Sequence, residues 1–267
     1  MSKLNVLLGI IIGLTILSCS SDNDEPNNPT LPDETNKKLI KSTEEGTYGV
    51  YEIIYVYNSD DIVTEIESSF TEFGQNIPED IHNIVYTYEN NLVVSAIVYE
   101  NDELYQTIDY NYENDRLTEE ISYTSSGTED EKMAYQYNAN GELSGFNFYV
   151  EEIPQQVMSY TYLNGNVVTT EDNSDYSEIT HDTNPSPYDY FTDTNKIIFG
   201  PLLVQSLSEN NIVNEIKTYN VGNSNESIRN YATNITYDSD NYPTTKILTE
   251  TNNNNTNTIR TTTFEYE

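Results

Sequence analysis

Polar and apolar residues alternate with a period of two along most of the chain after residue 47. From Leu104 to Tyr112, one set of alternate positions holds Leu, Gln, Ile, Tyr and Tyr, and the other holds Tyr, Thr, Asp and Asn. This alternation predicts a β-strand with one buried and one wet face. On the next strand, Leu117, Ile121 and Tyr123 share one parity. We therefore expect these three residues to meet Tyr110 and Tyr112 on the buried face.

A tyrosine motif recurs with the strands. Tyr-x-Tyr pairs begin at Tyr55, Tyr86, Tyr110, Tyr135 and Tyr160, and the last four starts are spaced by 24, 25 and 25 residues. Such a period indicates repeated structural units. The stretches between the aromatic residues favour the tight turns of β-hairpins. These stretches are Glu89-Asn90-Asn91, Asn101-Asp102, Asn114-Asp115, Asn138 to Gly141 and Asn164-Gly165.

Other segments fit the strand pattern less simply. Residues Leu92 to Val98 are apolar on both parities, which predicts cover on both sides. Residues Asp61 to Gly74 fit either an amphipathic helix or a strand, and the match of Tyr55–Val63 to the Tyr135–Leu143 unit favours the strand. Thr180 to Tyr188 reads as a long loop, and Ile197 to Leu207 as a short helix or another strand. Strand patterns then resume at Ile212–Tyr219, Ile228–Tyr237, Thr244–Thr249 and Ile259–Tyr266.

These patterns predict an all-β fold. We expect one domain over residues 47–267, an antiparallel meander of repeated hairpins that forms one curled sheet or an open half-barrel. Its roughly 220 residues suffice for a sizeable core.

The first residues carry a lipoprotein-type signal. Lys3 precedes an apolar run from Leu4 to Leu17. That run is shorter than the roughly 20 residues of a membrane span and fits residues 1–18 as a signal peptide. Ile16-Leu17-Ser18-Cys19 resembles a bacterial lipobox, which implies cleavage before Cys19 and lipidation of that residue. The alternative is an ordinary signal peptide with an incidental cysteine.

Residues 19–46 are polar and read as a disordered acidic tether. Within them, Ser21, Asp22, Asp24 and Glu25 resemble the acidic export signal of surface lipoproteins from the Bacteroidota. This resemblance implies a lipid-anchored location at the outer membrane, with surface display favoured over the periplasmic side. The run could also be a plain spacer.

Charge and cysteine content narrow the partners. With 11 basic and 45 acidic residues the chain has a formal charge of −34, so nucleic-acid phosphates are repelled and nucleic-acid binding is not expected. Anionic lipid is repelled too, which leaves an acyl group on Cys19 as the expected membrane contact. Cys19 is the only cysteine. The folded domain therefore has no intrachain disulfide and relies on burial.

The units Tyr110 to Leu117 and Tyr135 to Leu143 resemble the tyrosine–aspartate hairpin repeats of the Rhs type in a degenerate form. Together with the lipobox, the Asn184 to Pro187 loop and Tyr237 to Pro243, they make the chain similar to Bacteroidota surface lipoproteins of repeated β-hairpins. The Gly expected after Asp in the repeat is mostly Asn, Asp or Glu here. The resemblance implies a fold and a location, and it supplies no catalytic residue.

The histidine and carboxylate patterns of the sequence fall short of known catalytic and metal-binding motifs. His82 and His181 have no ligand partners at zinc spacing and are expected to be surface or loop residues. Asp238-x-Asp240-x-Tyr242 departs from a calcium loop, since Pro243 stands where Gly is required. Paired carboxylates could serve a glycosidase, but 45 acidic residues produce such pairs by chance. We predict no catalytic residue, cofactor or metal site.

Three functions stay open, with a non-enzymatic binding or envelope-structural module first. Its partner would be a glycan or another envelope protein. The second is a carrier that holds a lipid or other apolar ligand in a concave sheet face. The third is a carboxylate-dependent glycosidase. The 24 tyrosines could stack on sugars, but tyrosine also suits strands, and the absence of Trp favours the structural interpretation.

Overall fold

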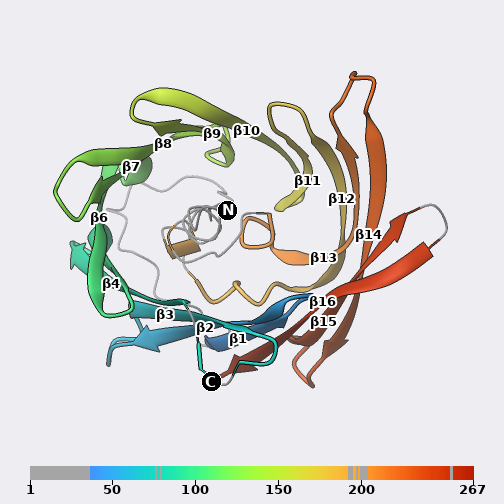
Figure 1. Ribbon diagram of the computed structural model, residues 1–267, viewed down its shortest axis with the longest axis horizontal. Helices are drawn as coiled ribbons and strands as arrows, with labels where there is room; N and C mark the ends of the chain where they lie inside the picture. The colour runs from blue at the N-terminus through green and yellow to red at the C-terminus, as the bar shows by residue number, and fades with distance from the viewer. Residues whose placement is uncertain are drawn as a thin grey trace, which may run out of the picture.

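The computed structural model describes residues 37–75, 77–78, 80–191, 195–196, 198, 204–252 and 255–267. These residues form an all-β barrel, shown in Figure 1. Its strands are β1 Leu39–Glu45, β2 Gly49–Tyr57, β3 Val63–Glu72, β4 Asp80–Glu89, β5 Leu92–Glu100, β6 Glu103–Glu113, β7 Arg116–Thr124, β8 Glu129–Tyr137, β9 Leu143–Val150, β10 Ile153–Leu163, β11 Asn166–Glu171, β12 Tyr176–Pro185, β13 Asn210–Tyr219, β14 Ser227–Tyr237, β15 Pro243–Asn252 and β16 Asn255–Tyr266.

Every strand pairs antiparallel with its sequence neighbours, and β1 pairs with β16 to close the sheet. The meander prediction is confirmed, whereas the curled sheet or open half-barrel is wrong. Closure leaves no strand edge with unpaired backbone groups. The closing strand β1 lies at Leu39–Glu45, inside the segment expected to be tether. The barrel domain therefore begins near residue 39 rather than at 47.

The turns follow the predicted chemistry. Asn90-Asn91, Asn101-Asp102, Asn114-Asp115 and Asn164-Gly165 all have positive φ at both positions. Two such residues make the turn that matches the twist of a hairpin. Longer turns repeat too: the side-chain oxygens of Asn58, Asn138 and Asp238 each accept two backbone N–H bonds from the following loop.

Most of the other strand predictions are confirmed. Asp61 to Gly74 contains β3 rather than a helix, and the four segments after Ile212 are β13 to β16. The expected loop at Thr180 to Tyr188 is partly wrong, because β12 continues to Pro185. Most of Ile197 to Leu207 lies outside the described residues.

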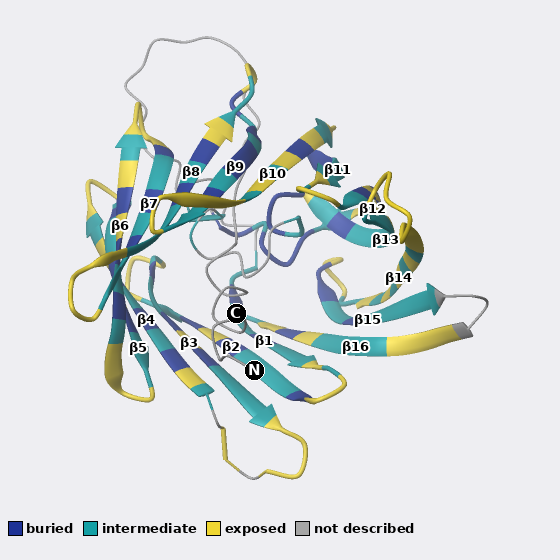
Figure 2. Ribbon diagram, turned by 45° about the horizontal axis from the view of Figure 1, so that its top comes forward, coloured by how far each residue is buried: buried dark blue, intermediate teal, exposed yellow. Residues whose placement is uncertain are grey.

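The apolar residues of the strands face the inside of the barrel. Figure 2 shows buried positions alternating with more exposed ones along strands such as β4 and β6. One continuous core joins residues from β1 to β12 and β16 with side chains of the connection between β12 and β13. Polar residues predominate on the outer parity, where some apolar side chains such as Ile54, Ile97 and Val157 are also exposed. Leu92 to Val98 follows the same rule, since Val93, Ala96 and Val98 are buried while Ile97 is 36% exposed. The prediction of cover on both sides is wrong there.

The tyrosine repeat has a recurring packing arrangement. In each pair the first tyrosine is buried, and the strand register shifts just before the second one. The second tyrosine then lies opposite an aliphatic residue that begins the next strand. These aliphatic residues are at most 1% exposed, and they are Val63, Val93, Leu117, Leu143 and Val167.

The shift is a β-bulge, in which one strand carries an extra residue and the alternation of faces is displaced. Its effect is clear on β7, where Glu120 pairs with Tyr110 on the inside and Ile121 pairs with Asp109 on the outside. Leu117 is buried as predicted, but the placement of Ile121 and Tyr123 on the buried face is wrong. Continuous parity counting fails because the bulge intervenes after Leu117.

Hydroxyl groups link successive units. Tyr57, Tyr112 and Tyr137 each donate an O–H bond of 2.7 Å to the backbone carbonyl of the buried aliphatic residue that begins the preceding strand. Those acceptors are Leu39, Val93 and Leu117. Tyr88 bonds Val63 in the same way, and Tyr266 bonds Pro243 at 2.8 Å. The second tyrosine of a pair therefore packs against one unit and hydrogen-bonds to the unit before it.

We predict that Tyr112→Phe lowers the free energy of unfolding by about 1–2 kcal/mol, because it leaves the buried Val93 carbonyl without its donor. Tyr162→Phe is the matched control, since the Tyr162 hydroxyl is buried and has no hydrogen-bond partner among the described residues. Removing that hydroxyl should leave stability unchanged or raise it. Urea unfolding measures both, and equal losses in the two variants would contradict the role of the bond.

Candidate functional site

The connection between β12 and β13 turns into the barrel (Figure 1). Its two ends are held together, because the Ser186 N–H donates to the Glu209 carbonyl at 2.8 Å. Aromatic contacts seat it on the inner wall: the rings of Phe191 and Tyr55 are 5.3 Å apart, and those of Tyr190 and Tyr57 are 6.0 Å apart. This segment narrows the interior and forms one wall of a cavity.

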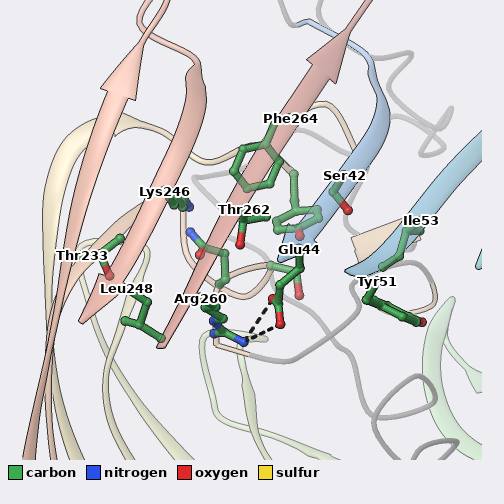
Figure 3. A pocket seen from close by; sticks show the side chains of 13 residues that line it. Ser42, Glu44, Tyr51, Ile53, Thr233, Lys246, Leu248, Arg260, Thr262 and Phe264 are labelled. Carbon is green, nitrogen blue, oxygen red and sulfur yellow. Dashed lines mark hydrogen bonds and ion pairs between the residues drawn. The ribbon is translucent and has the colours of Figure 1, made fainter. Parts of the chain in front are cut away.

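The cavity has a volume of about 160 Å³ and lies against β1, β2 and β14 to β16 (Figure 3). The register of the strands brings the lining residues together. One row of neighbouring positions on the inner face crosses four strands and consists of Lys246, Thr262, Glu44 and Tyr51. Ile53, Leu248 and Phe264 supply apolar wall, and Gln205 and Ser206 of the inward connection complete it. The space is enclosed by residues more than 150 positions apart in sequence, such as Ser42 and Lys246.

Lys246 is the unusual member of this lining. It is 6% exposed, and its Nζ has no hydrogen-bond partner in the described part of the chain. The ammonium position lies 5.4 Å from the centre of the Phe264 ring. Burial lowers the pKa of Lys246 well below its usual range, against an opposing effect of Asp182. A buried amine without an acceptor is a costly arrangement in a protein interior.

The neighbouring charges already have partners. Arg260 Nη1 lies 3.1 Å from Glu44 Oε2, as the dashed lines of Figure 3 mark. Asp182 accepts the Tyr237 hydroxyl and the backbone N–H groups of Asn184 and Asn211. The side-chain amide nitrogen of Gln205 is, like Lys246 Nζ, buried without an acceptor among the described residues, and the hydroxyl of Tyr51 is also buried without a partner there. Three residues that line the cavity therefore have a polar group without a hydrogen bond in the described part of the chain.

A second cluster of titratable groups lies on β7 and β8. Burial raises the pKa of Glu120 to about 8, and the hydrogen bond that Tyr135 Oη donates to it at 2.9 Å partly opposes the shift. Burial also raises the pKa of Glu131 to about 7. The adjoining space is only about 10 Å³, which holds about one water. This pair of carboxyl groups has no room for a sugar, so the site does not support the glycosidase.

The residues singled out from sequence have mixed outcomes. Cys19, Ser21, Asp22, Asp24 and Glu25 lie outside the described residues.

His82 is 5% exposed inside the barrel, so its expected surface or loop position is wrong. Likewise, His181 lies on β12 and its Nε2 is 3.1 Å from the Ser208 hydroxyl, while burial lowers its pKa to about 4.

Asp238 and Asp240 do not form a cation loop with each other. Both carboxylates contact Lys37, at 2.7 and 2.6 Å. Among the described residues no group of three or more His, Cys, Asp or Glu side chains is placed to hold a metal ion.

Sequence reasoning missed Lys246 and Glu120. A charged residue at an inward-facing position of a strand would have indicated each of them. On β7 the bulge changes which positions face inward, so counting alternate residues does not identify Glu120. On β15 the cavity around Lys246 depends on the partner strands and on the inward connection.

The comparisons with known proteins concern the fold. No protein-family profile matches the chain, and no curated protein matches its sequence. A porin-like protein from Bacteroides uniformis has a similar structure, with a TM-score of 0.61 and 14% identity over 90% of this chain and 100% of that one. A porin-like protein from Bacteroides vulgatus matches with a TM-score of 0.41 and 14% identity over 87% of this chain and 99% of that one.

The toxin complex TcdB2-TccC3-Cdc42 matches with a TM-score of 0.28 and 13% identity, over 79% of this chain and 12% of that chain. The first likeness confirms an all-β barrel fold. Within the described residues, no helix has the length and apolar character needed to cross a membrane.

We predict that the stability of the wild-type protein falls between about pH 4.5 and pH 8. Glu120 ionises near 4.5 when unfolded but keeps its proton to about 8 when folded, so its contribution is complete below pH 4.5 and lost at pH 8. The loss is about 1.4 kcal/mol per pH unit. Glu120→Gln should reduce this slope, leaving the part that Glu131 contributes up to about pH 7, whereas Glu119→Gln on the outer face should keep the full slope. Urea unfolding at pH 5 and pH 8 measures the difference, and equal slopes in all three proteins would refute the assignment.

Proposed function

We propose that this protein is a non-enzymatic module of the bacterial envelope, in which the barrel stands in water and a lipid on Cys19 holds it to the outer membrane. Its task would be binding or envelope structure. The proposal joins the barrel fold shared with a porin-like Bacteroides protein to the lipobox and acidic run of the sequence.

The polarity of the barrel wall carries this proposal. The outer face bears charged side chains at mid-strand, among them Glu52, Glu65, Glu67, Glu119, Lys132 and Glu178. A barrel that spans a bilayer instead has an apolar outer band, where a Lys or Arg at the midplane costs about 2–4 kcal/mol. The arrangement supports a barrel surrounded by water.

The interior supports the same conclusion. A porin has a polar, water-filled lumen, whereas this barrel has its apolar core there, with Tyr55, Phe146 and Phe191 among the buried residues. The inward connection between β12 and β13 packs against that core. The wall of tyrosines and the connection favour a scaffold over a channel.

The burial of the repeat tyrosines limits where a partner can bind. The first tyrosines of the repeat are at most 8% exposed, so they offer no surface for stacking on sugars. A glycan or a second envelope protein would instead contact the turns or the outer face. The carrier alternative remains for a small ligand, because the described cavity of about 160 Å³ is close to the size that accommodates benzene.

Cell fractionation tests the proposal. We expect wild-type protein to be acyl-labelled and membrane-bound, and Cys19→Ala to be unlabelled and released in folded form without detergent. A Cys19→Ala protein that stays in carbonate-washed membranes would show that the barrel itself is embedded, which would overturn the proposal.

The same strains test orientation. Protease added to whole cells should degrade the wild-type domain. Neutralising Asp22, Asp24 and Glu25 together should protect it if these residues direct export to the surface. Degradation in both strains would leave the acidic run as a spacer, and protection in both would place the domain on the periplasmic side.

A further inference from the structure

We propose that the cavity at Lys246 is a binding site for the carboxylate of a small apolar acid. The inference rests on the proposed binding role of the domain, and it is independent of the lipid on Cys19. The ligand would place its carboxylate at Lys246 Nζ and its apolar body against Ile53, Leu248 and Phe264.

The donors of the cavity carry the argument. Lys246 and Gln205 both line the cavity, and the side-chain nitrogen of each is buried without an acceptor in the described part of the chain. Buried donors are normally satisfied, and one left unpaired calls for a missing acceptor. A carboxylate offers two oxygens with several acceptor sites, and it forms a stronger bond to an ammonium than a neutral acceptor does.

The chain does not supply that acceptor from its own charged groups. The charged or basic groups that face Lys246 or share its cavity are Asp182, Arg260, His181 and Glu44. The cavity also contains Tyr51 and Tyr188, and burial raises the pKa of both hydroxyl groups. Asp182 is occupied by the Tyr237 hydroxyl and two backbone N–H groups, and Glu44 is paired with Arg260. His181 contacts Ser208. An external carboxylate would therefore meet a lysine whose amine has no hydrogen-bond partner in the described part of the chain.

Shape selects the rest of the ligand. A volume of about 160 Å³ accommodates roughly one six-membered ring or a short branched chain. The walls beside Lys246 include the Phe264 ring and two aliphatic side chains. An acid with a compact apolar body fits better than a long acyl chain or a polar sugar acid.

Binding at this site should change the protonation of Lys246, which can be measured. Burial lowers the pKa of Lys246 and so favours the neutral amine in the empty cavity, whereas a bound carboxylate favours the charged ammonium. Binding should then take up a proton from solvent. The affinity should fall as pH rises, because the proton becomes harder to acquire.

Titration calorimetry on the full-length lipid-free Cys19→Ala protein tests the proposal with benzoate and cyclohexanecarboxylate as probes. At least one acid should bind about tenfold or more tightly than its neutral alcohol, benzyl alcohol or cyclohexylmethanol. Heats in buffers of different ionisation enthalpy should show proton uptake. Lys246→Met should weaken the acid about tenfold or more, and Gln205→Leu should weaken it less.

Lys132→Met is the matched control, because Lys132 lies on the outer face over the Tyr149 ring. This variant should bind the acid as tightly as the wild-type protein does. Circular dichroism verifies that each variant is folded. Equal binding of acid and alcohol, full affinity in Lys246→Met, or no binding of either acid at millimolar concentration would overturn the proposal. Such a failure with normal membrane anchoring would leave the structural envelope role intact.

Discussion

The second tyrosine of each repeat pair is the contact on which the rest of the barrel depends. Its ring packs inside opposite a buried aliphatic residue, and in four consecutive units, from Tyr57 to Tyr137, its hydroxyl bonds the carbonyl of the unit before. An isolated hairpin is marginally stable in water. The tyrosine makes each hairpin depend on its neighbour, so stability accumulates around the barrel without a disulfide.

Because these rings lie inside the barrel, its inner face is apolar and its outer face is mainly polar. Because the inner face holds most of the aromatic and aliphatic residues, Glu, Lys, Thr and Asn predominate on the outer face. Glu65 and Asn83 are examples there, and their side chains hydrogen-bond to each other at 2.6 Å. The result is the inverse of a membrane-spanning barrel. The same inward packing encloses the few polar residues that face the interior, which makes Lys246 and Glu120 the chemically distinctive groups.

The sequence predicted the local structure well, because turns and alternation are local properties. Asn114-Asp115 reverses the chain as expected. The Asp61 to Gly74 segment contains a strand, as the match of Tyr55–Val63 to the Tyr135 unit indicated. The closure was not predictable, since β1 reads as polar tether and its partner β16 lies more than 200 residues away. The prediction that Ile121 and Tyr123 face inward was wrong, because the bulge after Leu117 shifts the alternation of faces on β7. The cavity also escaped prediction, because it needs the register of five strands and the inward path of the connection after β12.

Closure between β1 and β16 is the central claim, and a disulfide across that seam tests it most directly. Thr43 and Thr263 are register partners on the outer face, so Thr43→Cys with Thr263→Cys in a Cys19→Ala background should cross-link almost completely on mild oxidation. Thr245 is the partner of Thr263 on the far side of β16. Thr43→Cys with Thr245→Cys, about 10 Å apart across two strand spacings, should not cross-link. Intact-mass measurement distinguishes the products, and a Thr43–Thr263 pair that remains reduced would mean that the barrel is open.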